Sequence, residues 1–215
     1  IATAIRSLET MINRRAPKWP SSVSSPSPGS DVALAIAALG GLVKISDDKK
    51  MKIQAPTIES VRLDGLDLSG SYMRGFTLSK VSLQGATISS ADLEMSTLRD
   101  VQMTKVIAHG TKLSRATLEA TCLEEATLVK ADFSDSKVAR SDFNVANMTN
   151  AVMTGAVLYE TRFQGTILSG ADLSDADFGS ATELTQDQWL QAGARNGNFV
   201  RPKDEFKPSN LKICG

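Results

Sequence analysis

Residues 81–100 read VSLQGATISSADLEMSTLRD, and a large apolar side chain stands at every fifth position of this stretch, namely Leu83, Ile88, Leu93 and Leu98. The same spacing runs from Leu63 to Phe178, where 23 of the 24 central positions carry Leu, Ile, Val, Met or Phe. A period of five matches neither the 3.6-residue period of a helix nor the two-residue alternation of a strand. The stretch therefore predicts a repeat architecture with one unit per five residues.

The other positions of the five-residue unit are also restricted. With the large apolar residue called i, position i−2 is small or β-branched, and position i−1 favours Asp, Thr or Asn, as in Asp92-Leu93 and Asn147-Met148. Position i+2 is often glycine: Gly65, Gly70, Gly75, Gly85, Gly110, Gly155, Gly165 and Gly170. Because Gly, Ser, Asn and Asp tolerate tight or left-handed backbone, we expect a turn in every unit.

Stretches such as LDLSG (66–70), KADFSDS (130–136) and GADLSDADF (170–178) resemble the A(D/N)LXX signature of the pentapeptide-repeat family. The resemblance covers more than half of the chain. It implies a β fold, a right-handed quadrilateral β-helix of about six 20-residue coils. Each side of such a coil directs residues i and i−2 inward, and backbone hydrogen bonds join coils that lie about 4.8 Å apart.

Charged residues support a coil of twenty residues. If side chains j and j+20 stack, opposite charges should meet and like charges should be absent. Nine outward pairs fit this rule: Arg74–Glu94, Lys80–Asp100, Asp92–Lys112, Arg99–Glu119, Lys105–Glu125, Lys112–Asp132, Arg115–Asp135, Arg140–Glu160 and Asp142–Arg162. An exposed pair contributes only about 0–1 kcal/mol, so these pairs are informative mainly about the coil period.

One core position is irregular. Ala108 occupies a central position, and its neighbours Val106 and Ile107 are unusually apolar. Two arrangements are open: Met103 fills a small void, or the coil bulges so that Ile107 turns inward. The only histidine, His109, is expected to be a solvated turn residue rather than a metal ligand or a base.

We divide the chain into a helical N-terminal region (1–57) with a Pro/Ser linker (17–30), the repeat (58–182), and a C-terminal capping helix with a tail (183–215). Residues 1–16 have the spacing of an amphipathic helix, which either docks on its own domain or a sister chain, or lies near a membrane. Asp31 is expected to cap a second helix that ends at Gly40-Gly41 and covers the first coil.

The C-terminal helix carries a start signal. Thr185 is the predicted N-cap, Gln188 completes a capping box, and Leu184 and Trp189 occupy the staple positions. The open end of a β-helix exposes unpaired backbone and an apolar core, so it needs a lid over Phe178. The residues expected to form that lid are Trp189, Leu190 and Ala194.

Composition argues against several functions. With 24 acidic and 24 basic side chains, the whole chain offers no electrostatic argument for nucleic acid or an anionic membrane. Cys122 and Cys214 are the only cysteines; they either form one bridge or, as we favour, remain free thiols, with Cys122 exposed and unreactive. The sequence contains no cluster of metal ligands and no phosphate or dinucleotide motif, so we predict no catalytic residues, metal or cofactor.

The favoured function is therefore a non-enzymatic scaffold for an unidentified protein partner. Candidate contact residues are outward apolar side chains: Val145, Val152, Val157 and Tyr159 on one coil, and Ile107, Val129 and Ile167 on another face. An alternative comes from the family, in which some members mimic duplex DNA and bind type II topoisomerases. Residues 59–181 carry 11 basic and 16 acidic side chains, a net charge of 11 − 16 = −5, and their interleaving disfavours this alternative.

The N-terminal order, in which INRRAPKWP and DVALAIAALGGL precede LDGLDLSG, resembles bacterial pentapeptide proteins whose repeat follows a membrane-anchored region. This resemblance implies a cytoplasmic domain tethered at the inner face of the membrane. The first residue is Ile1, which favours a fragment or a processed product. A homodimer is a further expectation.

Overall fold

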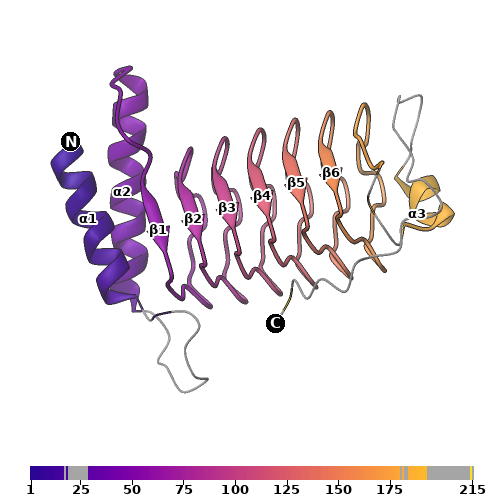
Figure 1. The fold of residues 1–215 in the computed structure, drawn as a ribbon, viewed down its shortest axis with the longest axis horizontal. Coiled ribbons are helices and arrows are strands. Elements are labelled where there is room, and N and C mark those ends of the chain that lie inside the picture. Colours follow the sequence, from indigo (N-terminus) through magenta and orange to yellow (C-terminus); the bar gives the residue numbers. More distant parts are fainter. Residues whose placement is uncertain (17, 19–28, 180, 182–183, 193–213, 215) are drawn as a thin grey trace.

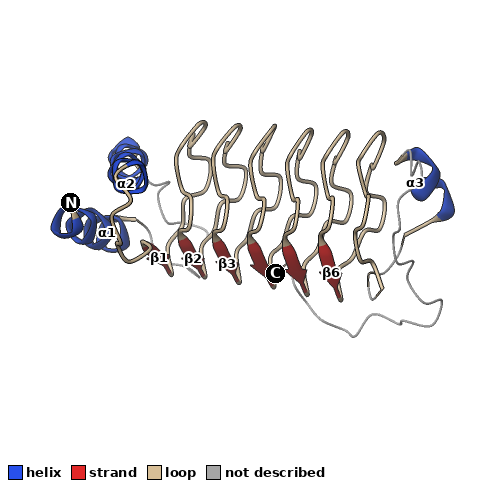
Figure 2. Ribbon diagram, turned by 90° about the horizontal axis from the view of Figure 1, so that it is seen from above, coloured by secondary structure: helices blue, strands red, loops and turns tan. Residues whose placement is uncertain are grey.

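The computed structural model describes residues 1–16, 18, 29–179, 181, 184–192 and 214, which form an elongated rod (Figure 1). The body of the rod is a stack of similar coils with two helices at its N-terminal end and one helix at its C-terminal end. Figure 2 shows the short strands lined up along one side of this stack. The chain is thus a parallel β-solenoid, as predicted.

A six-stranded parallel sheet fixes the length of the coil. Its strands are β1 Thr57–Glu59, β2 Thr77–Ser79, β3 Thr97–Arg99, β4 Thr117–Glu119, β5 Lys137–Ala139 and β6 Val157–Tyr159. Leu78 pairs with Leu98, and Leu98 pairs with Leu118. Isolated bridges on the other sides keep the same offset, as between Asp67 and Thr87. The predicted twenty-residue coil is confirmed.

Every unit turns through a left-handed residue at position i+2. All 24 of these positions from Ser60 to Asp175 have positive φ, and they carry 16 residues other than glycine and 8 glycines. The Asp or Asn at i−1 accepts a hydrogen bond from the backbone N–H of i+1, as Asp132 does from Ser134 at 2.9 Å and Asn147 from Thr149 at 3.1 Å. These local hydrogen bonds explain the choice of Asp and Asn at i−1.

Central and i−2 side chains fill the interior of the rod. Phe143 and Phe163, one coil apart, stack with ring centroids 5.2 Å apart. At the irregular position both Ala108 and Val106 are fully buried, and Ile107 points outward and bridges to Thr87 and Thr127 in normal register. The bulge alternative is therefore wrong. The larger Val106 side chain occupies the i−2 position, which Ala86 and Ala126 fill in adjacent coils.

The charged pairs form only in part. Four of the nine predicted ion pairs occur in the structure: Arg74–Glu94, Arg99–Glu119, Lys105–Glu125 and Asp142–Arg162. Arg115 and Arg140 instead reach the diagonal partners Glu94 and Glu119. Long arginine side chains can reach either neighbour in the next coil, so register alone does not decide the partner.

Helix α1 (Ala2–Arg15) closes the free edge of β1. The Glu9 carboxylate accepts a hydrogen bond from Thr57 N at 2.5 Å. The Asn13 amide donates to Thr57 O and accepts from Glu59 N, each at 3.0 Å. These side chains supply the hydrogen bonds that a preceding coil would otherwise make. The first of the two expected positions, docking on its own domain, is the one observed.

Helix α2 (Ser30–Asp48) is longer than predicted and begins without the expected cap. Gly29 is its N-cap, and the Asp31 carboxylate pairs with Arg15 at 3.1 Å. The helix continues through Gly40-Gly41 because Gly40 serves packing rather than termination. A Cβ atom at Gly40 would lie 2.1 Å from the Tyr72 carbonyl oxygen, so only glycine allows α2 to lie this close to the first coil.

Helix α3 (Gln186–Gln191) closes the other end and has the predicted Thr185–Gln188 capping box. The Trp189 ring packs edge-on against Phe178 at 4.9 Å. Leu190, expected in the lid, is 70% exposed, and Ala192 is buried instead. The Pro/Ser linker, except Lys18, Gly29 and Ser30, lies outside the described residues, as do Ala194 and the tail apart from Cys214.

Candidate interaction surface

The bridges between coils define four outward faces, each named by its i−1 residues. Face A carries Arg62, Ser82, Gln102, Cys122, Asp142 and Arg162. Face B carries Asp67, Thr87, Ile107, Thr127, Asn147 and Ile167. Face C carries Tyr72, Asp92, Lys112, Asp132, Val152 and Asp172. Face D is formed by strands β1–β6.

The four candidates predicted on one coil lie in different places around the rod. Val157 and Tyr159 are both outward residues of β6 on face D and are 46% and 52% exposed. Val152 lies on face C and is half-buried. Val145 is a turn residue, 57% exposed, beyond the side that carries Phe143. Only Val157 and Tyr159 therefore present neighbouring apolar surface.

The three remaining candidates lie on face B. Ile107 and Ile167 are exposed, whereas Val129 is half-buried. The bridges from Ile107 through Thr127 and Asn147 to Ile167 place three coil spacings between the two isoleucines. At about 4.8 Å per spacing this amounts to roughly 14 Å. His109 is exposed, as predicted.

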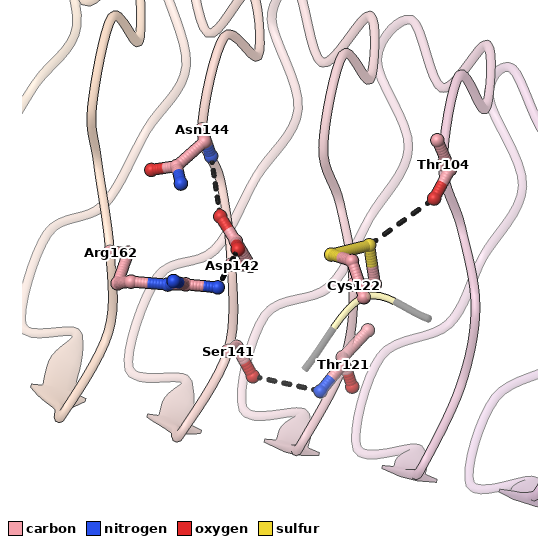
Figure 3. The surroundings of a disulfide bond; sticks show 8 residues. Thr104, Thr121, Cys122, Ser141, Asp142, Asn144 and Arg162 are labelled. Carbon is pink, nitrogen blue, oxygen red and sulfur yellow. Dashed lines mark hydrogen bonds and ion pairs between the residues drawn. A yellow bond between two sulfur atoms is a disulfide. The ribbon is translucent and has the colours of Figure 1, made fainter. Parts of the chain in front are cut away.

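Face A is closed by a disulfide that contradicts our expectation of free thiols. Cys122 is fully buried and bonded to Cys214, 92 residues further on, with their Cα atoms 5.3 Å apart (Figure 3). The i−1 position does point outward, but Cys214 returns to this face and covers it. Repeat periodicity carries no information about that return, so the presence of only two cysteines was the one available signal.

The polar side chains around the disulfide are mostly engaged. Asp142, which is buried, pairs with Arg162 and accepts a hydrogen bond from Asn144 N at 2.9 Å (Figure 3). The Thr104 hydroxyl lies 3.2 Å from the Cys122 sulfur. Ser141 accepts a hydrogen bond from the backbone N–H of Thr121.

The pKa shifts of three side chains are explained by burial and by local hydrogen bonds. Burial, followed by the hydrogen bond that the hydroxyl donates to Asp47 at 2.6 Å, raises the pKa of Tyr72. Hydrogen bonds from Ser69 and Ser174 lower the pKa of Asp67 and Asp172, respectively. These groups are explained by α2 docking and by turn structure, and they do not converge on one site.

A cavity of about 210 Å³ lies at the N-terminal end of the rod. Its lining residues come from α1 and from the segment before β1: Ala2, Ile5, Arg6, Glu9, Ile53, Gln54 and Ala55. Glu9 already accepts a hydrogen bond from Thr57 N, so this carboxylate serves the closure of the sheet edge.

Eight copies of the family described as pentapeptide repeats match residues 62–100, 82–119, 111–150 and 146–182. These stretches cover more than half of the sequence, and the coil geometry agrees with them. The chain belongs to the pentapeptide repeat family. No curated protein matches this sequence.

Several solved structures resemble this pentapeptide repeat protein in fold. A trypsin-treated form of QnrB1, a plasmid-mediated fluoroquinolone resistance protein, is 19% identical over 59% of this chain and 66% of its own, with a TM-score of 0.48. HetL from Nostoc, involved in heterocyst differentiation regulation, is 20% identical over 66% and 84%, with a TM-score of 0.22. A protein from the Arabidopsis thaliana thylakoid lumen is 30% identical over 59% and 73%, with a TM-score of 0.26.

Proposed function

We propose that this pentapeptide repeat protein is a non-enzymatic scaffold that binds a partner protein through face D near β6. The carrying observation is the pair Val157 and Tyr159, two exposed apolar side chains on one strand. In the same columns β2 carries Thr77 and Ser79. The apolar pair is therefore a local departure from a polar face, and tyrosine is enriched where proteins bind one another.

The same columns provide a conservative test. The double variant Val157→Thr and Tyr159→Ser places on β6 the residue types that β2 already carries, so the coil should fold. Partner proteins captured by the tagged wild type from native extract would be identified, and the affinity of each for purified wild type and variant compared. We expect at least about a tenfold loss, or 1.4 kcal/mol, for the variant.

A matched control removes apolar surface from face B. The double variant Ile107→Thr and Ile167→Asn introduces the residue types of Thr127 and Asn147, which occupy the same column. It should bind the partner like the wild type. Equal binding by wild type and the β6 variant would refute the proposed surface.

The charges do not favour the DNA-mimic alternative. In the described part of the chain, five acidic side chains of the rod form ion pairs, and Glu94 pairs with both Arg74 and Arg115. The 16 acidic side chains of residues 59–181 are also interleaved with 11 basic ones, which disfavours a continuous acidic strip. Inhibition of gyrase supercoiling at low protein concentration would favour the DNA-mimic function over the scaffold proposed above.

Membrane tethering and homodimer formation remain predictions from the sequence. Among the described residues, no helix is both long enough and apolar enough to cross a bilayer. Fractionation of native cells would test the tether, and sedimentation of the purified chain would test the dimer.

A further inference from the structure

We propose that Cys122, Glu124 and Cys214 form a binding site for a thiophilic divalent cation, such as Zn²⁺, when the disulfide is reduced. One possible ligand atom from each residue lies within 4.8 Å of the other two. The two sulfur atoms are bonded to each other in the structure. After reduction they must separate to about 3.7 Å to bind one tetrahedral Zn²⁺ ion, with Zn–S bonds of about 2.3 Å and a Zn–O bond of about 2.1 Å. A water molecule would complete four-coordination.

The coil geometry places two of the ligands in advance. Cys122 and Glu124 stand at positions i−1 and i+1 around the buried Leu123, so both belong to the same side of one coil. Cys214 is brought to them by the chain end. Two ligands are therefore fixed by the rod, and the third comes from a segment 92 residues away.

Glu124 is the carboxylate available for this role. In the part of the chain that the structure describes, its side chain has no hydrogen-bond or ion-pair partner, and it is half-buried. Asp142, on the same face, is already bound by Arg162 and Asn144. The Thr104 hydroxyl, 3.2 Å from the Cys122 sulfur, can donate a hydrogen bond to a thiolate.

Reduction and metal binding are linked in a definite order. A dithiol reductant transfers two electrons and two protons, which break the S–S bond and give two thiols while the reductant becomes a disulfide. The cation then displaces both thiol protons and binds two thiolates and the Glu124 carboxylate. The oxidised protein has no thiolate to offer. Two thiolates favour Zn²⁺ over Mg²⁺ and Ca²⁺.

The test measures Zn²⁺ affinity of the full chain by competition with a chromophoric chelator, after dithiol reduction and anaerobic removal of the reductant. Reduced wild type should bind one equivalent, and Co²⁺ should give a thiolate-to-metal absorption band. The oxidised wild type and the reduced Cys122→Ser/Cys214→Ser variant should bind at least about tenfold more weakly. Far-ultraviolet circular dichroism would verify that each sample keeps its sheet.

A neighbouring glutamate provides the control for the carboxylate. Glu124→Gln should weaken Zn²⁺ binding about tenfold or more, whereas Glu125→Gln, which removes a side chain paired with Lys105 at 3.5 Å, should not. Reduced wild type that binds no more tightly than the double serine variant would overturn the site. Glu124→Gln that binds like the wild type would overturn the three-ligand arrangement.

Discussion

At the scale of single residues, the turn position i+2 shows how backbone conformation selects side chains. All of these positions are left-handed, yet most carry a side chain, including Lys, Asp, Glu and Arg. Val145 is the β-branched member, at φ 59°. The left-handed region costs an L-residue about 1–2 kcal/mol, and β-branching makes it a clear outlier. Val145 is therefore the most strained of the candidate surface residues.

We expect Val145→Gly to increase the free energy of unfolding by about 0.5–1 kcal/mol, because the relieved strain exceeds the added chain entropy of glycine. Chemical denaturation would measure the change. Val152→Gly is the control, since Val152 does not have positive φ and bridges to Asp132 and Asp172, so this variant should be less stable than wild type. A loss of stability in both variants would show that Val145 is not strained.

The raised pKa of Tyr72 predicts that the stability of the folded chain falls at alkaline pH. Burial and the hydrogen bond to Asp47 raise its pKa in the folded chain above the ordinary value of 10.0. The unfolded chain therefore releases this proton first, so the contribution of Tyr72 is complete below pH 10 and declines as pH rises further. Stability of wild type should therefore fall more steeply than stability of Tyr72→Phe between about pH 10 and 12.

The phenylalanine variant should also be about 1 kcal/mol less stable near neutral pH, because Asp47 loses its hydrogen-bond donor. Denaturant midpoints measured across the pH series would check both statements. Parallel curves for the two proteins would contradict the assigned role of Tyr72, because the two chains differ only at this residue.

At the scale of elements, the sequence predicted correctly those features whose interacting residues lie close together in the chain. The Thr185–Gln188 capping box was predictable because its partners lie three residues apart. The Gln188 amide also donates to the carbonyls of Phe163 and Thr166, at 2.9 and 2.8 Å, and this docking role depends on tertiary contact. The same reason explains Gly40, whose effect arises from Tyr72 in the first coil rather than from helix propensity.

Alanine substitutions at Gly40 and Gly41 distinguish the effect of packing against the first coil from the effect of helix propensity. Gly40→Ala should lower the free energy of unfolding by about 1–3 kcal/mol, because its methyl group would collide with the Tyr72 carbonyl oxygen and force α2 away from the coil. Gly41→Ala meets nothing within 4 Å and should raise stability by about 0.8–1 kcal/mol through helix propensity. Urea denaturation would compare the two, and equal effects would exclude close docking as the role of Gly40.

At the scale of the whole molecule, a strict period made the fold predictable and left the site largely open. The coil length followed from charged pairs twenty residues apart, and the register confirms it. Arg115 and Arg140 form ion pairs with residues 21 positions away rather than 20, and the repeat period does not specify such partners. The Cys122–Cys214 contact depends on the path of the chain after α3, and a pattern that ends at Phe178 is silent about that path.

The period also predicts which deletions the rod tolerates. Deletion of residues 97–116 removes one complete coil, keeps every later residue in phase, and retains Cys122 and the residues that dock α2 and α3, although Thr104 beside the Cys122 sulfur is lost. Deletion of residues 97–114 shifts the phase, so that Leu118 and Leu123 fall on turn positions while Ala116 and Thr121 become central.

The 20-residue deletion should keep a cooperative unfolding transition at a lower midpoint, because one set of coil interfaces is lost. The 18-residue deletion should lose the sheet signal or aggregate, because large apolar side chains would be exposed in every later coil. Circular dichroism with thermal unfolding distinguishes these results, and similar folded spectra for both deletions would contradict the dependence of this rod on phase.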